Sequence, residues 1–147
     1  MTPELSDEEL LRFSRQILLA QIDVAGQLRL QQSSVLIVGL GGLGSPVALY
    51  LAAAGVGTLH LADFDRVDVS NLQRQIVHDM RSIGQLKVQS AAHRLQQINP
   101  RLELHLHEQA MAADTLGAAV AAVDLVLACS DNFSTREAVN AACVAAG

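Results

Sequence analysis

Apolar residues along the chain change repeatedly between strand-like and helix-like spacing, beginning with the uninterrupted apolar run at 35–38. A continuous run of this length is typical of a parallel strand that is covered on both faces. Further strands are expected at 58–62, 102–106 and 124–129. Helical spacing is found between them, over 45–55, 85–99, 111–123 and from 134 onward. This alternation predicts an α/β fold with a Rossmann-like, doubly wound, mostly parallel sheet and helices on both faces.

The residues before the first strand predict a helical extension. Ser6 and Glu9 form a capping-box pattern ahead of Leu10, Phe13 and Ile17, whose spacing predicts one amphipathic helix. A second short helix is expected over 24–31. We therefore expect two parts: an N-terminal helical extension at 1–32 and a Rossmann-like domain at 33–147.

Capping residues predict where two of the later helices begin. Ser45 followed by Pro46 is typical of a helix cap and a first helical residue. Ser134 with Glu137 is a second capping-box pattern, and it predicts the start of the last helix.

The charge and the apolar segments exclude several classes of function. The formal net charge of −5 leaves no positive surface for nucleic acid. The longest apolar stretch, near 47–56, is too short to cross a bilayer, and the acidic N-terminus is unlike a secretory signal. A soluble, cytoplasmic protein is predicted.

The cysteines and two of the histidines give no sign of a metal site. Cys129 and Cys143 lack zinc-site spacing and are expected to be structural, and His105 and His107 are expected to be solvent-facing polar residues.

A glycine motif follows the first strand and precedes a helix. It reads Gly39-Leu40-Gly41-Gly42-Leu43-Gly44, which satisfies G-x-G-x-x-G in the context that binds nucleotide phosphates. Asp63 ends the next strand, where a carboxylate can hold ribose hydroxyl groups. The motif alone indicates only a nucleotide, and a nicotinamide cofactor is its default interpretation.

Cationic and polar residues beyond the second strand favour a nucleoside triphosphate instead. Ser70, Asn71, Gln73 and Arg74 lie within five residues. Lys87 is expected in the first turn of a helix, a position that is unfavourable for a cation unless an anion is close. Arg15, Arg74 and Lys87 fit a phosphate site, although spacing alone equally allows three solvated surface cations.

Asp131-Asn132 follows the fourth strand directly, where parallel sheets place ligand contacts. A carboxylate at this position can hold Mg²⁺ together with water and phosphate oxygens. A helix-capping aspartate is the alternative.

Six segments taken together resemble the MoeB/ThiF/HesA family, bacterial relatives of the ubiquitin-activating enzymes. The segments are Arg12-Phe13-Ser14-Arg15-Gln16, Gly39-Leu40-Gly41-Gly42-Leu43-Gly44, Asp63-Phe64-Asp65, Ser70-Asn71-Leu72-Gln73-Arg74-Gln75, Gly84-Gln85-Leu86-Lys87 and Ser130-Asp131-Asn132. They occur in family order and their combination is very specific.

The resemblance implies ATP-dependent adenylation of the C-terminal glycine of a ubiquitin-like sulfur-carrier protein, such as the small subunit of molybdopterin synthase or the thiazole-biosynthesis carrier. Asp63 would hold the ribose and Asp131 the magnesium ion. Arg15 would reach into the active site of the other subunit of a homodimer. The implied catalytic residues are Arg15, Arg74, Lys87 and Asp131. The implied nucleotide-binding residues are Gly39, Gly41, Gly42, Gly44, Asp63, Ser70, Asn71, Leu72, Gln73, Arg74, Lys87, Asp131 and Asn132.

The chain departs from the family pattern in its length. Family members continue into two Cys-x-x-Cys pairs for a structural zinc, a crossover loop and strands that grip the carrier, and these are absent here. The resemblance therefore implies a C-terminally truncated adenylation domain, with zinc expected only in the missing part. A nucleotide-binding or dimerisation module without turnover is the alternative function. A nicotinamide oxidoreductase leaves Lys87 and the segment 70–74 unexplained. The sequence leaves the carrier and the pathway open.

Overall fold

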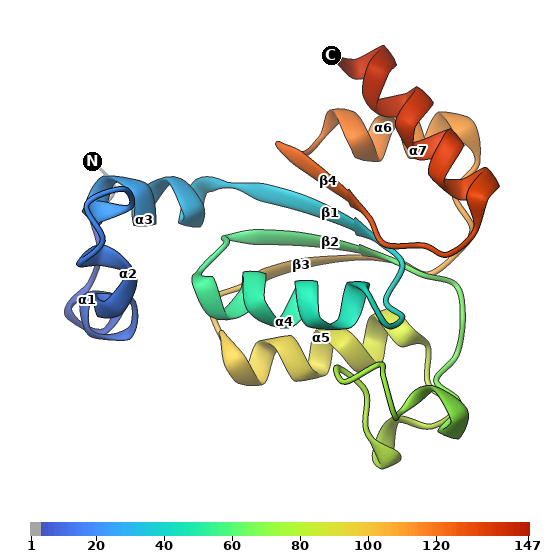
Figure 1. Cartoon of the computed structure of the whole chain (residues 1–147), viewed down its shortest axis with the longest axis horizontal. Coiled ribbons are helices and arrows are strands. Elements are labelled where there is room, and N and C mark those ends of the chain that lie inside the picture. Colours follow the sequence, from blue (N-terminus) through green and yellow to red (C-terminus); the bar gives the residue numbers. More distant parts are fainter. Residues whose placement is uncertain (1–3) are drawn as a thin grey trace.

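The protein is a four-stranded parallel sheet in the order β3-β2-β1-β4, with helices on both faces (Figure 1). The computed structural model describes residues 4–147. The strands are β1 (Ser34–Val38), β2 (Thr58–Ala62), β3 (Glu103–His107) and β4 (Leu125–Ala128). Every strand pair is parallel. The predicted α/β, doubly wound architecture is confirmed, with each strand within two residues of its predicted bounds.

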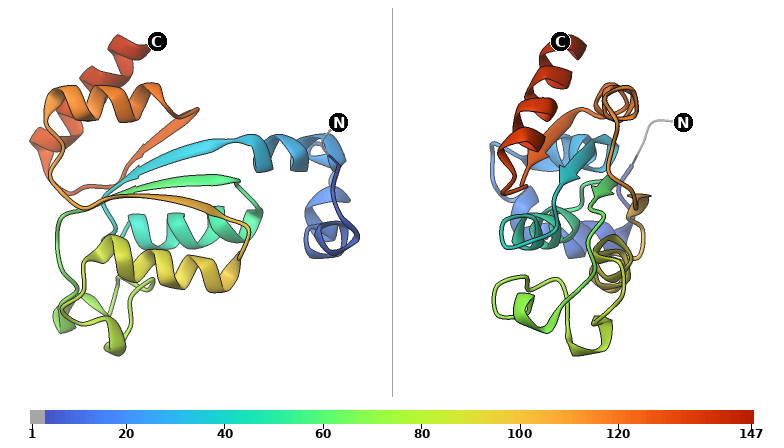
Figure 2. Two further views of the ribbon diagram at one scale, coloured as in Figure 1. Left: turned by 180° about the vertical axis from the view of Figure 1, so that it is seen from behind. Right: turned by 90° about the vertical axis from the view of Figure 1, so that its right-hand side faces the viewer.

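Two helices cover each face of the sheet (Figure 2). Helices α4 (Gly44–Ala54) and α5 (Lys87–Ile98) pack on one face, where Ile37, Leu59 and Leu61 are buried in the larger core cluster. Helices α6 (Ala113–Ala121) and α7 (Phe133–Ala146) cover Leu36 and Val38 on the other face. Successive residues of β1 thus alternate between two cores, which explains why its sequence is apolar throughout.

Three short helices precede β1 and lie at the amino-terminal end of the strands (Figure 1). They are α1 (Asp7–Arg12), α2 (Ser14–Ile17) and α3 (Asp23–Gln32). The Ser6–Glu9 capping box is present as predicted. The single amphipathic helix through Ile17 was a wrong prediction, because the backbone leaves helical geometry at Phe13, whose ring is only 4% exposed and packs against the turn at Gly55. The boundary at residue 32 stays a prediction.

Both capping predictions for the later helices were wrong. Helix α4 begins two residues before Pro46, at Gly44, and its cap position is the apolar Leu43, so it has no side-chain cap; the buried Ser45 hydroxyl instead donates to Leu40 O at 3.4 Å. Helix α7 is capped by Asn132, whose Oδ1 accepts from Thr135 N at 3.2 Å. The Ser134 hydroxyl donates to the same Oδ1 atom at 2.7 Å, so this serine supports the cap instead of forming it.

The β2–β3 half of the sheet is less covered on one side, as the alternating pattern of the third strand predicts. His105 is exposed and His107 is half-buried. Both rings stack on His60 of β2, at centroid distances of 4.5 and 5.5 Å. Within residues 4–147 no helix is long and apolar enough to span a membrane.

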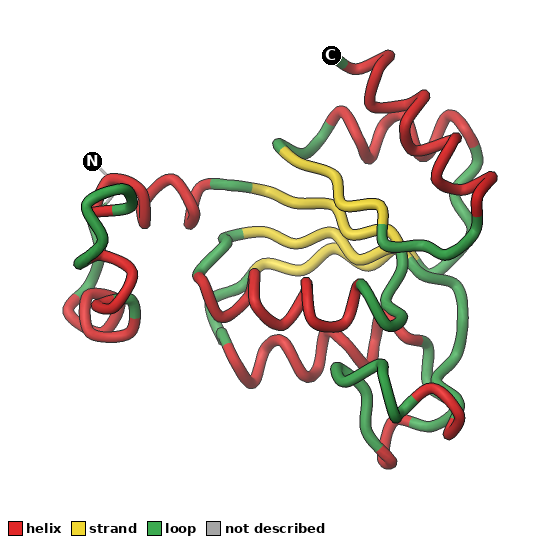
Figure 3. The backbone as a smooth tube through the Cα atoms, in the orientation of Figure 1, coloured by secondary structure: helices red, strands yellow, loops and turns green. Residues whose placement is uncertain are grey.

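The connection from β2 to α5 is the longest loop of the site (Figure 3). It contains two single-turn 3-10 helices, η1 (Val69–Asn71) and η2 (Met80–Ser82). An isolated bridge between Arg66 and Leu86 closes its base. The loop therefore returns to its starting point beside the carboxyl end of β2.

Candidate functional site

The candidate site lies at the carboxyl ends of β1 and β4, where the strand order reverses. After β1 the chain adds β2 and β3 on one side, then places β4 on the other side of β1. Open parallel sheets bind ligands in the crevice at such a switch point. The glycine motif follows β1 and Asp131 follows β4, so two predicted segments meet here.

Two glycines in the turn after β1 are fixed by close backbone contacts. Gly39 has φ +98°, and a Cβ there would lie 2.9 Å from Ser130 N. A Cβ on Gly44 would lie 1.8 Å from Gly39 O. Only glycine allows the turn to close on itself and to lie against the end of β4.

The start of α4 is suited to bind an anion. No side chain caps this 11-residue helix, and its first turn contains no acidic residue. The amino end of a helix carries partial positive charge and free N–H groups. Phosphate is the ligand class that such an end attracts most often.

Asp63 holds the glycine turn from the end of β2. Its Oδ2 accepts from Leu40 N at 2.8 Å, and its Oδ1 accepts from Asp65 N at 2.9 Å. An ionised carboxylate has about four acceptor positions, so about two remain. Asp63 can therefore support the turn and still accept hydrogen bonds from ribose hydroxyls.

Arg74 is brought to the glycine turn by the long loop. Its Cγ and Cδ atoms lie 3.6 Å from the point where a Cβ of Gly42 would be. One guanidinium nitrogen donates to Ser70 O at 3.2 Å, and the side chain is otherwise exposed. A cation is thus placed beside the predicted phosphate turn.

The neighbours of Arg74 in the predicted set shape the loop itself. The Ser70 hydroxyl donates to Asp68 Oδ1 at 2.6 Å, and Asn71 Oδ1 accepts from Asp68 N at 3.1 Å. The contact of Asn71 belongs to the capping box of η1, and the Ser70 hydroxyl adds a further bond to the capping residue Asp68. Leu72 is half-buried and Gln73 is exposed. Ser70 and Asn71 therefore have a structural role that the sequence did not predict.

Lys87 is the first residue of α5, as predicted, and its side chain is only 8% exposed. Its Nζ lies 3.6 Å from Asp65 Oδ2, and the backbone N–H donates to Asp65 O at 2.9 Å. A lysine ammonium group has three N–H donors, and with only one partly solvated carboxylate near it the Lys87 ammonium can still bind a further anion. The cation is therefore held in the site and not dispersed in solvent.

Asp131 and Asn132 have separate roles after β4. Asn132 is the cap of α7, whereas Asp131 is exposed and makes no hydrogen bond or ion pair with the residues described here. The helix cap that Asp131 was expected to form as the alternative to binding Mg²⁺ is thus formed by Asn132. Asp131 is left with both oxygens available.

Arg15 lies far from this site in its own chain. It is exposed on α2, which stands at the amino-terminal end of the sheet, opposite the glycine turn (Figure 1). The structure therefore brings together the glycine turn, Asp63, Arg74, Lys87 and Asp131, but not Arg15.

The decisive comparison is with family models: the description "ThiF family" matches residues 13–147. The chain belongs to the ThiF family. The predicted resemblance is confirmed, and the match includes every part of the site described above.

Curated members of the ThiF family are similar to nearly the whole chain. The sulfur carrier protein ThiS adenylyltransferase of Escherichia coli (strain K12) is 52% identical over 141 residues, which are 96% of this chain and 56% of that protein. The molybdopterin-synthase adenylyltransferase of the same organism is 50% identical over 143 residues, covering 97% of this chain and 57% of its own length. The chain thus spans little more than half of these relatives.

A solved structure supports the same assignment. The E. coli tRNA threonylcarbamoyladenosine dehydratase TcdA in complex with ATP superimposes with a TM-score of 0.89 and 27% identity, over 97% of this chain and 58% of that one. The shared ThiF-family fold is thus found in a protein crystallised with ATP.

Two buried residues of this ThiF-family site received no role from the sequence: Gln75, which ends one of the family segments, and His78. Gln75 is 4% exposed, its Oε1 has no hydrogen-bond partner among the described residues, and its Nε2 lies 3.5 Å from the Cβ position of Gly41. His78 is 6% exposed and contacts Leu40 O and Ser90 Oγ. Spacing gave no signal for either, because their partners are distant in sequence.

A metal ion in this site would be bound by a single carboxylate of the protein and not by a cluster of protein ligands. Residues 4–147 contain no group of three or more His, Cys, Asp or Glu side chains placed to hold a metal. Mg²⁺ commonly binds through one or two carboxylates plus substrate phosphates, so Asp131 fits it and a structural zinc has no ligands in this part. Burial raises the pKa of the free Cys129 thiol, which fits its predicted structural role.

Two hollows in the surface lie outside the site. One of about 290 Å³ is at the amino-terminal end of the sheet and is lined by Glu9, Gly57 and Arg101, among others. The other, of about 280 Å³, lies between α5 and η2 and is lined by Arg81, Ser90 and His93, among others. Neither includes the glycine turn or Asp131, so the chemistry of the residues, not the depth of a hollow, locates the site.

Proposed function

We propose that the protein binds ATP with Mg²⁺ and adenylates the C-terminal glycine of a ubiquitin-like sulfur-carrier protein. One observation carries the proposal: at the switch point the glycine turn lies against Arg74 and against the backbone of Ser130, the residue before the exposed Asp131, while Lys87 is held 3.6 Å from Asp65 at the end of β2. A dinucleotide site needs the glycine turn and Asp63 but not the cations. A triphosphate with its metal ion needs all of them.

Each residue has a role that follows from its position. The turn at Gly39, Gly41, Gly42 and Gly44 and the start of α4 receive phosphate, and Asp63 holds the ribose. Arg74 and Lys87 neutralise the phosphates, with Ser70, Asn71, Leu72 and Gln73 forming the loop around them. Asp131 holds Mg²⁺, and Asn132 keeps its neighbour in place by capping α7.

The reaction needs no nucleophile from the protein. An oxygen of the carrier's C-terminal carboxylate forms a bond to the α-phosphorus while the bond from that phosphorus to the pyrophosphate oxygen breaks. Pyrophosphate leaves with the electron pair and an acyl-adenylate remains. Catalysis is then positioning and stabilisation of phosphate charge, which is what Arg74 and Lys87 supply.

The partners follow from the relatives. Proteins that are 52% and 50% identical act, by their names, on ThiS and on molybdopterin synthase, so a carrier of this class is the proposed partner. We propose a homodimer in which Arg15 serves the other subunit. The two free cysteines support a reducing, cytoplasmic location.

The second candidate is a nucleotide-binding or dimerisation module without turnover. It needs only the glycine turn, Asp63 and the cations Arg74 and Lys87, all of which the described residues contain. ATP–pyrophosphate exchange measured with and without a carrier protein separates the two. Exchange that depends on the carrier supports the enzyme, and nucleotide binding without exchange supports the module.

Calorimetry with ATP, with and without Mg²⁺, and with NAD tests the proposed nucleotide directly. We expect ATP to bind in a magnesium-dependent manner and NAD not to bind. Tight binding of NAD with no response to ATP and magnesium would overturn the proposal.

A further inference from the structure

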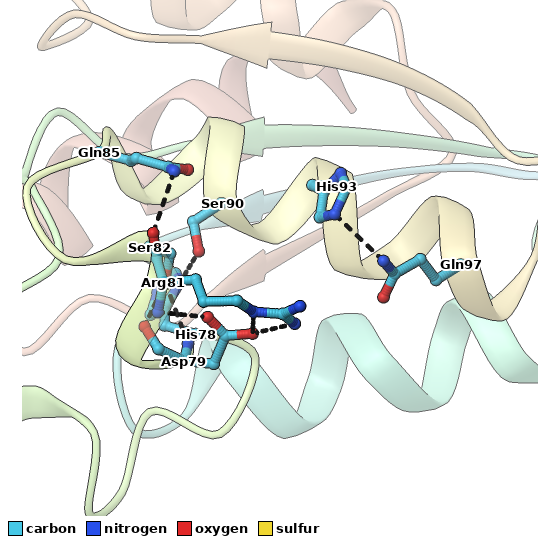
Figure 4. A network of polar contacts seen from close by, with 8 residues as sticks. All are labelled: His78, Asp79, Arg81, Ser82, Gln85, Ser90, His93 and Gln97. Carbon is cyan, nitrogen blue, oxygen red and sulfur yellow. Dashed lines mark hydrogen bonds and ion pairs between the residues drawn. The ribbon is translucent and has the colours of Figure 1, made fainter.

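A buried histidine, His78, connects two parts of the site that are far apart in sequence. It lies between η1 and η2 and is 6% exposed. Its Nε2 is 3.1 Å from Leu40 O, and its Nδ1 is 2.8 Å from Ser90 Oγ. Figure 4 shows Ser90 reaching down from α5 toward the ring. Both ring nitrogens are therefore engaged.

The partners determine which nitrogen of His78 carries the proton. A carbonyl oxygen can only accept, so Nε2 is protonated and donates to Leu40 O. Burial lowers the pKa of His78, and the positive charge of Lys87 acts in the same direction, against the hydrogen bond to Leu40 O, which raises it; the neutral ring is therefore favoured more than in solvent. Nδ1 is then an acceptor, and the Ser90 hydroxyl donates to it.

Each of these contacts ends on an element of the phosphate site. Leu40 lies in the glycine turn, and its N–H is held by Asp63 at 2.8 Å while its C=O is held by His78. Ser90 lies on α5 three residues after Lys87. The imidazole ring therefore spans the gap between the glycine turn and the helix that presents Lys87.

The surrounding structure does not need His78 for its own anchoring. Val77 and Val88, on either side of this contact, are buried in the larger core cluster. The next turn is closed by its own bonds, since Asp79 N donates to Ser82 Oγ at 3.0 Å and Asp79 caps η2 (Figure 4). The buried contacts of Val77 and Val88 hold the backbone in place, and the two hydrogen bonds of His78 are not needed for that purpose.

We propose that His78 is a positioning residue that sets the distance between the glycine turn and Lys87 and thereby adjusts the site to a triphosphate. The inference rests on the proposed function, since it assumes that both elements bind phosphate. It assigns no chemical step to His78. If His78 has this role, the affinity for nucleotides whose phosphates reach both elements depends on His78 more than the affinity for nucleotides with one phosphate.

The test compares magnesium-ATP with AMP as ligands of the whole protein, by calorimetry. His78→Phe keeps the ring volume but removes both hydrogen bonds, whereas in His78→Gln the side-chain amide can still donate to Leu40 O. We expect His78→Phe to weaken ATP binding by about tenfold or more and AMP binding by no more than about twofold. His78→Gln should recover part of the loss.

The helix side of the contact is tested with Ser90→Ala. This change should weaken ATP binding less than His78→Phe does. The double variant His78→Phe/Ser90→Ala should be no weaker than His78→Phe alone, because both changes break one connection. His93→Phe is the matched control on the exposed face of the same helix, where the His93 ring is hydrogen-bonded to Gln97 at 3.1 Å (Figure 4). Its ratio of ATP to AMP affinity should equal that of the unaltered protein.

Three outcomes would overturn the inference. The first is an unchanged ratio of ATP to AMP affinity in His78→Phe, whether or not both affinities fall together with the melting temperature, and the second is a ratio in His93→Phe that falls as far as in His78→Phe. If His78→Phe does not fold, an unchanged ratio in both His78→Gln and Ser90→Ala is decisive instead. Failure of the unaltered protein to bind magnesium-ATP is distinct, because it overturns the proposed function itself and this inference with it.

Discussion

At the scale of single residues, Gly44 is the most constrained position of the site. A Cβ there would lie 1.8 Å from Gly39 O, a backbone atom that cannot move without opening the turn. We expect Gly44→Ala to lower the free energy of unfolding by about 3 kcal/mol or more, measured by urea denaturation. Gly117→Ala is the matched control, because nothing lies within 4 Å of its added Cβ; it should gain about 0.5–1 kcal/mol from helix propensity. Equal stability of the two variants would contradict this account of the turn.

The stacked histidines on β2 and β3 predict a dependence of stability on pH. Burial, then the charges of His105 and His107, lowers the pKa of His60 below 6.5, against a smaller opposite effect of Glu103. The pKa values of His78 and His107 are lowered as well, mainly by burial. The unfolded state therefore binds more protons as the pH falls below about 6.5, and the free energy of unfolding should decrease from there toward the lower folded pKa values.

His60→Val should make this decrease shallower in urea titrations at successive pH values. Thr58→Val, on the same face of the same strand, introduces the same side chain without removing a titrating group and should leave the slope unchanged. A slope that is identical in His60→Val and in the unaltered protein would exclude His60 as a contributor.

At the scale of elements, the start of α7 places a structural and a functional residue side by side. Asn132 caps the helix, so Asn132→Ala should cost about 1 kcal/mol of stability. Asp131 has no bonded partner in the described chain, so Asp131→Ala should change stability by less than about 0.5 kcal/mol and remove the magnesium-dependent part of ATP binding. Denaturation and calorimetry on both variants check the pair. Loss of folding in Asp131→Ala, with unchanged affinity in the folded fraction, would make Asp131 the structural residue.

The elements also show which features a sequence can predict. Apolar runs such as 35–38 determine the strands, because burial on two faces allows few other residues. Helix boundaries are harder to predict: Phe13 interrupts a helix to reach Gly55, a tertiary contact, and Asn132 and Ser134 compete locally for the cap of α7, which Asn132 forms.

The same limit applies to the site. Arg74 and Lys87 are identified by chemistry within recognisable segments; the structure places Arg74 beside the turn and holds Lys87 next to Asp65. Gln75 and His78 act through buried contacts with residues 34 to 38 positions away, which no local pattern encodes. Arg15 remains a prediction, because its proposed partner belongs to another subunit.

At the scale of the whole molecule, Arg15 should act across a subunit interface. It lies on α2 at the opposite end of the sheet from the site of its own chain. Mixing inactive Arg15→Ala with inactive Asp131→Ala in the complete protein gives mixed dimers in which one site has both residues intact. ATP–pyrophosphate exchange should partly return in the mixture.

Absence of activity in that mixture would falsify the assignment in trans, provided that subunit exchange is shown independently by labelling the two variants. If Arg15 served its own subunit, each site of the mixed dimer would lack one residue. The homodimer itself can be measured separately by light scattering.

The strand order also fixes when this site can exist during synthesis. Ser34, at the start of β1, is bonded to Asp124, 90 residues later, whereas β2 and β3 follow β1 much sooner. Chains leave the ribosome from the N-terminus, and long loops close late. A nascent chain can therefore assemble β3-β2-β1 with its larger core while β4 is still inside the ribosome. Because Ser130 and Asp131 arrive only with β4, the proposed binding of magnesium-ATP would begin only after β4 has joined β1.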